Sequence, residues 1–143
     1  MEMGDIYGLL RWLGLSAEST RFFYVSYAVY LTTQQPARTS FGMDCSGFVD
    51  WVFYNATGGG YIIGHGGGAM MQHTYCPPIS WEDAQPGDLV FYPEDTHVGI
   101  VGGRDENGEL LIIHCASGYN NVVVTEKEGF TPVGRPDYYV RRE

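Results

Sequence analysis

Cys45 has the neighbours that a nucleophilic thiol needs. It follows Asp44, a residue type that favours the N-cap of a helix, and apolar residues recur at helical spacing from Phe48 onward. The unpaired N–H groups and positive dipole end of that helix would lie beside the sulfur and lower the pKa of the thiol. A thiolate is the nucleophile of cysteine catalysis. The alternative is a small apolar side chain in a helix–sheet contact, which is the commoner role of a cysteine.

Two histidines are predicted to lie together at one end of a β-hairpin. Residues 97–101 and 109–114 have strand-like patterns, and an Asn-Gly pair between them favours a tight turn. His97 opens the first strand and His114 closes the second, so antiparallel pairing brings both imidazoles to the same end of the sheet. With Cys45 they would supply a nucleophile, a base and a polar residue that orients the base. Each histidine alone is more often structural, but the combination favours catalysis.

Alternation along residues 109–114 also assigns side chains to the two faces of the sheet. We expect the helix of Cys45 to pack on the face of His114. Cys115 should point to the opposite face and act as a small apolar residue. The two expected sets are His114 with Leu110 and Ile112, and Cys115 with Leu111 and Ile113.

The order of the patterns predicts an α+β fold, in which helices pack on one face of a central antiparallel sheet of about five strands. Helical patterns precede strand patterns along the chain. The expected helices cover residues 6–15 and 21–31 and a segment from 44 onward, and the expected strands cover 89–92, 97–101, 109–114, 121–125 and 138–140.

The composition limits the possible partners. A chain of 143 residues with 44% hydrophobic residues can fold as one domain. It carries 8 Lys and Arg against 17 Asp and Glu, and this net charge of −9 opposes binding to nucleic acid or to an anionic membrane surface. The three cysteines are an odd number, so at least one thiol should be free.

Metal, cofactor and membrane roles find no support in the motifs. The sequence has no CxxC or HExxH motif and its four histidines are scattered, so we expect neither a metal site nor a cofactor. It shows no signal peptide and no segment of transmembrane length. We therefore expect either a cytoplasmic protein or a domain of a longer exported chain.

Two further segments hold candidate site residues. In the aromatic helix at 21–31, Tyr27 and Tyr30 are three positions apart and could present hydroxyl groups on one face. Residues 58–68 include seven glycines, with His65 among them. This segment is either a flexible surface loop or the wall of a groove for an extended ligand.

Three blocks of the sequence together form a recognisable pattern: Asp44-Cys45-Ser46-Gly47-Phe48-Val49, Pro86-Gly87-Asp88-Leu89-Val90-Phe91 followed by His97-Val98-Gly99-Ile100, and His114-Cys115-Ala116-Ser117. With these blocks, the chain resembles the NlpC-type cell-wall cysteine endopeptidases over roughly residues 20–140. This resemblance implies a papain-like core in which Cys45 is the nucleophile, His97 the base and His114 the third, polar member. It also implies a substrate, the peptidoglycan stem peptide, cut outside the cytoplasm between γ-D-glutamate and the adjacent lysine or diaminopimelate.

The sequence departs from this family in one motif. Family members commonly carry Gly-x-Pro-Tyr before the cysteine, with the tyrosine hydroxyl beside the thiol, and this motif is absent here. Tyr30 is the nearest substitute as a donor to the oxyanion, with Tyr27 in reserve. Further candidates for contact with oxyanion or substrate are Asp44, Ser46 and His65.

We therefore interpret residues 1–143 as a single cysteine peptidase domain, with its core at about 20–140, that acts as a monomer on peptidoglycan in the bacterial cell wall. One alternative is a non-catalytic wall-binding module on the same fold. Another is an amidase or acyltransferase that uses the same Cys–His chemistry.

Overall fold

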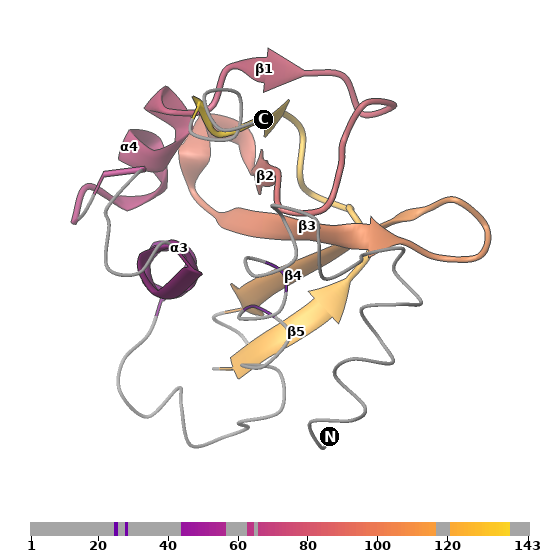
Figure 1. The fold of residues 1–143 in the computed structure, drawn as a ribbon, viewed down its shortest axis with the longest axis horizontal. Helices are drawn as coiled ribbons and strands as arrows, with labels where there is room; N and C mark the ends of the chain where they lie inside the picture. The colour runs from indigo at the N-terminus through magenta and orange to yellow at the C-terminus, as the bar shows by residue number, and fades with distance from the viewer. Residues whose placement is uncertain are drawn as a thin grey trace.

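A computed structural model describes residues 25, 28, 44–56, 63–64, 66–116 and 121–137. The elements within these residues form two helices and a six-stranded sheet (Figure 1). They are α3 (Cys45–Ala56), α4 (Gly68–Thr74), β1 (Pro78–Ile79), β2 (Leu89–Phe91), the 3-10 turn η2 (Pro93–Asp95), β3 (Val98–Arg104), β4 (Leu110–Ala116), β5 (Asn121–Thr125) and β6 (Val133–Gly134).

The sheet is antiparallel throughout, in the order β1-β6-β2-β3-β4-β5. This confirms the predicted α+β class, with six strands instead of about five. The predicted strand at 138–140 lies outside the described residues. So do the predicted helices at 6–15 and 21–31, apart from Val25 and Ala28, which are both helical and buried.

The predicted hairpin joins β3 to β4, with Ile100 opposite Ile113. An Asn-Gly pair favours a turn in which these two residues are the central positions, but here Gly108 is the last residue of the turn. The N–H of Gly108 donates to the Asp105 carbonyl over 3.0 Å, and Gly108 takes a φ of +82°, which suits glycine. The turn therefore spans Asp105–Gly108, and the Asp105 side chain accepts the N–H of Asn107 at 2.8 Å.

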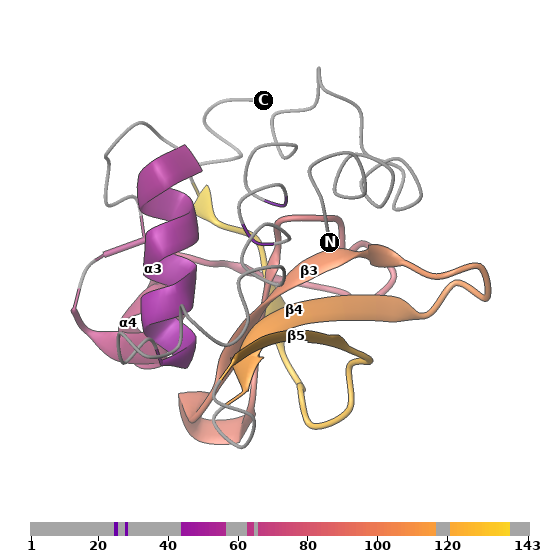
Figure 2. The same ribbon diagram turned by 90° about the horizontal axis from the view of Figure 1, so that it is seen from below.

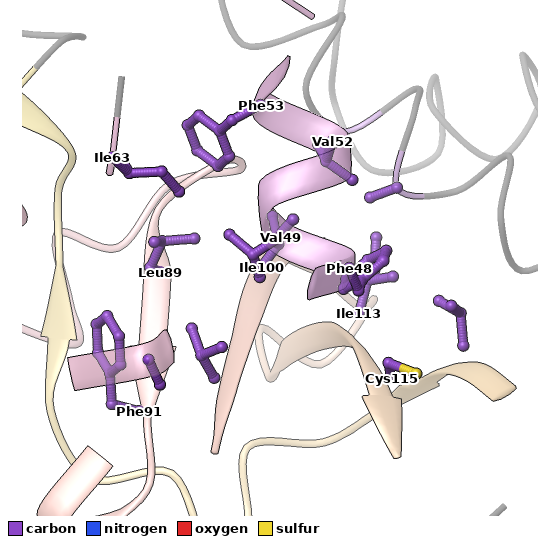
Figure 3. Close-up of a cluster of buried hydrophobic side chains, with 14 of the residues drawn as sticks. Phe48, Val49, Val52, Phe53, Ile63, Leu89, Phe91, Ile100, Ile113 and Cys115 are labelled. Carbon is purple, nitrogen blue, oxygen red and sulfur yellow. The ribbon is translucent and has the colours of Figure 1, made fainter. Parts of the chain in front are cut away.

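Side chains alternate between two apolar clusters, one on each face of the sheet, as predicted. One cluster joins α3 to the sheet (Figure 3), and the other lies on the opposite face. The first includes Phe48, Val49, Val52, Phe53, Val98, Ile100, Ile113 and Cys115; the second includes Val90, Val101, Leu110, Ile112, Phe130 and Val133.

The prediction that α3 packs on the face of His114 is wrong. The helix packs beside β3 and β4 (Figure 2), and its apolar side chains lie on the face of Ile113 and Cys115 (Figure 3). These apolar side chains complement the apolar stripe of α3, whereas the His114 face is covered by Phe130, from the loop between β5 and β6. As predicted, Cys115 is a buried residue of the core, 3% exposed.

Candidate active site

Asp44 caps α3 directly before Cys45. Its Oδ1 accepts the N–H of Gly47 at 2.6 Å, and its carbonyl accepts the N–H of Phe48 at 2.9 Å. This confirms the predicted N-cap. Gly47 serves the cap, because a Cβ at this position would lie 2.8 Å from the capping carboxylate oxygen.

The Cys45 thiol is less acidic than the sequence predicts. Burial raises its pKa above the ordinary value, and the negative charge of Asp44 also raises it. The N–H groups of Val98, Ser46 and Cys45 itself lower the pKa, but these effects do not outweigh burial. The helix N-terminus is therefore present at the sulfur as predicted, yet the prediction of a lowered pKa is wrong.

The sulfur lies at the start of β3. The Val98 N–H that stabilises the thiolate belongs to the peptide bond that joins His97 to Val98. Cys45 therefore sits beside the backbone of His97, although α3 and the His114 imidazole occupy opposite faces of the sheet. The first residue of α3 therefore lies at the end of β3 that directly follows His97.

His97 and His114 are hydrogen-bonded to each other, since His97 Nε2 and His114 Nδ1 are 2.8 Å apart. Their rings meet edge to face, with centroids 5.0 Å apart. The hairpin thus brings the two imidazoles together at one end of the sheet, as its predicted register requires. Cys45, the first residue of α3, lies beside the backbone N–H of Val98, the residue that follows His97 at the start of β3.

Both imidazoles are shielded by aromatic rings. Phe130 stacks on His97 with centroids 5.6 Å apart and meets His114 edge-on at 5.3 Å. Tyr92 packs edge-on against His97 at 4.9 Å. Burial lowers the pKa of His97, and burial together with the charge of His97 lowers the pKa of His114 to about 4. Both rings are therefore neutral near pH 7, and a neutral imidazole can accept a proton from a thiol.

Residues 27–130 match the NlpC/P60 family, which is well over half of the chain. This chain belongs to the NlpC/P60 family. Over 77 residues it is 40% identical to a protein of Mycobacterium tuberculosis named probable endopeptidase, in a match that covers 53% of this chain and 17% of that protein. The chain therefore spans only a small part of the length of this relative.

Solved structures show the same fold. The NlpC/p60 domain of the peptidoglycan hydrolase SagA superposes with a TM-score of 0.61 at 27% identity, covering 80% of this chain and 97% of that one. A Staphylococcus aureus protein described as similar to lipoprotein, of the NLP/P60 family, gives a TM-score of 0.61 at 22% identity and covers 85% and 42% of the two chains. The papain-like fold that the sequence resemblance implied is confirmed.

The NlpC/P60 domain has one more polar side chain at the histidine pair, which sequence reasoning missed. Thr125 Oγ1 lies 2.8 Å from His114 Nε2, and the Thr125 hydroxyl donates to the Glu126 carbonyl at 2.9 Å. The strand register places His114 opposite Val123, two residues before Thr125 on the same face. The alternation of the predicted strand at 121–125 could therefore have identified Thr125.

Ser46 forms hydrogen bonds that join the start of α3 to its cap and to α4. Its hydroxyl donates to Asp44 Oδ1 at 3.3 Å, and its carbonyl accepts Gln72 Nε2 at 2.9 Å. Gln72 also donates to Asp50 Oδ1 at 3.1 Å, so α4 is fastened to the first turns of α3. Sequence reasoning did not single out Gln72, a residue only 2% exposed.

The structure describes only some of the candidate residues. Tyr27, Tyr30 and His65 lie outside the described residues, so their roles stay predictions. His73 lies on α4, where its Nδ1 is 2.8 Å from Asp95 Oδ1. Among the described residues, no three His, Cys, Asp or Glu side chains are grouped as a metal site requires.

Proposed function

We propose that this NlpC/P60 domain is a cysteine endopeptidase that hydrolyses peptidoglycan stem peptides between γ-D-glutamate and the adjacent lysine or diaminopimelate. One observation carries the proposal: the hydrogen-bonded pair of His97 and His114 adjoins the peptide bond whose N–H faces the Cys45 sulfur. The relatives support it, since one is named a probable endopeptidase and another a peptidoglycan hydrolase.

In the proposed mechanism, His97 acts as the base. With the thiol of Cys45 protonated and the imidazole neutral at rest, the proton moves from sulfur to His97 as the sulfur attacks the peptide carbonyl. His97 then gives this proton to the leaving amine, and a thioester forms on Cys45. Water, deprotonated by His97, hydrolyses the thioester and restores the thiol. His114 holds the imidazole of His97 in orientation throughout.

The negative charge on the tetrahedral intermediate needs hydrogen-bond donors. The N–H groups of Cys45 and Ser46, in the first turn of α3, already face the sulfur, because both lower the pKa of the thiol. The cap leaves them available, since Asp44 takes the N–H of Gly47 instead. We propose the Tyr30 hydroxyl as the additional donor.

The proposed site of action is the bacterial cell wall, outside the cytoplasm, with the domain acting as a monomer. The proposed reaction requires a thiol, two imidazoles and water, and its partner is the stem peptide. Within the part of the chain that the structure describes, no helix has the length and apolarity to cross a membrane.

The test is digestion of purified peptidoglycan by the wild-type protein and by Cys45→Ala, using one preparation that contains lysine and one that contains diaminopimelate. Mass spectrometry of the released peptides identifies the new termini. We expect a new amino terminus on the diamino acid with the wild type. We expect a loss of several powers of ten in rate with Cys45→Ala, because no other group replaces the nucleophile.

Other reaction products would show that the domain is an amidase or an acyltransferase instead of an endopeptidase. Cleavage that frees the stem peptide from the sugar would identify an amidase, and transfer to an added amine an acyltransferase. Unchanged hydrolysis by Cys45→Ala would refute the cysteine mechanism. If neither protein releases peptides but both sediment with peptidoglycan, the domain is a wall-binding module.

A further inference from the structure

Three hydrogen bonds in series lead from the proposed base to a backbone carbonyl. His97 Nε2 meets His114 Nδ1 at 2.8 Å, His114 Nε2 meets Thr125 Oγ1 at 2.8 Å, and Thr125 Oγ1 meets the Glu126 carbonyl at 2.9 Å. A neutral imidazole carries its proton on one of its two nitrogens. The donors in this series could therefore all point from His97 toward Thr125, or from Thr125 toward His97. Only the first arrangement leaves an unprotonated nitrogen on His97 that can accept the proton of the thiol.

The Glu126 carbonyl decides the direction because a carbonyl oxygen only accepts hydrogen bonds. The single hydroxyl proton of Thr125 therefore points to Glu126, and Thr125 Oγ1 accepts a proton from His114 Nε2. His114 Nδ1 then carries no proton and accepts one from His97 Nε2. The remaining nitrogen of the neutral His97 ring, Nδ1, is left with a free lone pair.

We propose that Thr125 is a positioning residue that fixes the tautomers of His114 and His97, so that His97 presents an unprotonated Nδ1 to Cys45. Thr125 acts through His114 on His97. The reverse direction would put the proton on His97 Nδ1 and set lone pairs of Thr125 and Glu126 against each other at 2.9 Å. The role of His97 as a base rests on the proposed function, whereas the tautomers are a property of the free protein.

The surroundings of the pair keep both rings in the neutral state that this argument needs. His114 is 6% exposed, and Phe130 covers both imidazoles. A protonated His114 would donate from both of its nitrogens and would break the series. The lowered pKa of about 4 for His114 keeps this form scarce at neutral pH.

The direct test is nuclear magnetic resonance of the substrate-free protein with nitrogen-15 in its histidine rings, at pH 7.5. In the wild type we expect both His97 and His114 to carry the proton on Nε2, with Nδ1 unprotonated. In Thr125→Val, which keeps the shape and removes the hydroxyl, both rings should become mixtures of the two tautomers. A proton on Nδ1 of either ring in the wild type would overturn the proposal, as would an unchanged pattern in Thr125→Val.

Activity gives a second readout. We expect Thr125→Val to lower kcat by about three- to tenfold, the size of one lost hydrogen bond, with KM nearly unchanged. Thr125→Ser keeps the hydroxyl and should restore both the tautomers and most of the rate. The matched control is Thr74→Val, which removes a hydroxyl that bonds to the Met71 carbonyl on α4 and should leave the rings unchanged. A Thr125→Ser variant that behaves as Thr125→Val would refute the role of the hydroxyl.

The two readouts separate this inference from the proposed function. Absence of peptide hydrolysis by the wild type would refute the peptidase, and the tautomer spectrum would still confirm or refute the role of Thr125. Thermal unfolding of each variant identifies any that fails to fold, and in that case Thr125→Ser alone decides.

Discussion

Acidification should destabilise this domain through His114, and His114→Asn should remove that sensitivity. The pKa of His114 falls from an ordinary 6.5 to about 4 in the folded protein, because the ring is buried and lies beside His97. The unfolded chain therefore binds a proton on this residue at a higher pH than the folded one. The contribution of His114 to the free energy of unfolding is therefore fully present above pH 6.5 and is lost as the pH falls toward 4.

The size of the effect follows from the shift. A difference of about 2.5 pKa units, at 1.36 kcal/mol per unit, corresponds to about 3 kcal/mol for His114 below pH 4. One unit below the ordinary pKa, at pH 5.5, the loss should be about 1.4 kcal/mol. Asparagine does not titrate in this range, and it can still accept a hydrogen bond from His97 and donate one to Thr125.

The assay is urea unfolding of wild type and His114→Asn at pH 7.5, 6.5, 5.5 and 4.5, followed by the fluorescence of the three tryptophans. Acidic residues titrate in both proteins, so the difference in unfolding free energy between wild type and His114→Asn at each pH reports the titration of His114. We expect this difference to shift in favour of the variant as the pH falls. Cys115→Ala is the control, because its thiol stays protonated over this range and the corresponding difference should stay constant. If the difference in unfolding free energy between wild type and His114→Asn also stays constant with pH, the claim that His114 is buried in its neutral form is refuted.

Three further predictions concern the proposed reaction and its frame. His97→Ala should lower kcat/KM about a hundred- to ten-thousandfold, and more than His114→Asn, because His97 exchanges the proton; equal losses would contradict the assigned roles. Tyr30→Phe should lower turnover about a hundred- to a thousandfold with little change in Tm if the hydroxyl binds the oxyanion, and unaltered turnover would place the donor elsewhere. Gly99→Ala should cost about 1–3 kcal/mol in urea unfolding, since its Cβ would lie 2.7 Å from a side chain of β4. An unchanged unfolding free energy would show that β3 and β4 move apart at this position without cost.

Local patterns were enough to predict the elements that carry the site. The apolar spacing from Phe48 and the capping residue Asp44 located α3, which begins at Cys45. Alternation located β2 to β5, and the hairpin that follows from it brought His97 to His114. These features depend on residues close together in sequence or on the pairing of neighbouring strands.

Features that depend on distant residues could not be predicted in this way. The strands β1 and β6 have two residues each, too few for alternation, and they pair Pro78 with Gly134 across the chain. Local patterns do not tell which face of the sheet α3 covers, and the opposite face is covered by Phe130, from a loop far along the sequence. The helix α4 was missed because a glycine-rich segment precedes it and it is only seven residues long.

The error in the pKa of Cys45 has a physical cause that bears on the proposed mechanism. The helix N-terminus lowers the pKa of the thiol through its N–H groups, but packing the same first turn against β3 buries the sulfur and raises it more. Asp44, which caps the helix and so holds those N–H groups in place, adds a negative charge that also opposes the thiolate. Burial lowers the pKa of His97 as well, so burial favours the neutral thiol and the neutral imidazole at rest. In the proposed peptidase, the thiol therefore gives up its proton to His97 only as the substrate carbonyl is attacked, which makes the orientation of His97 by His114 and Thr125 more important than the acidity of Cys45.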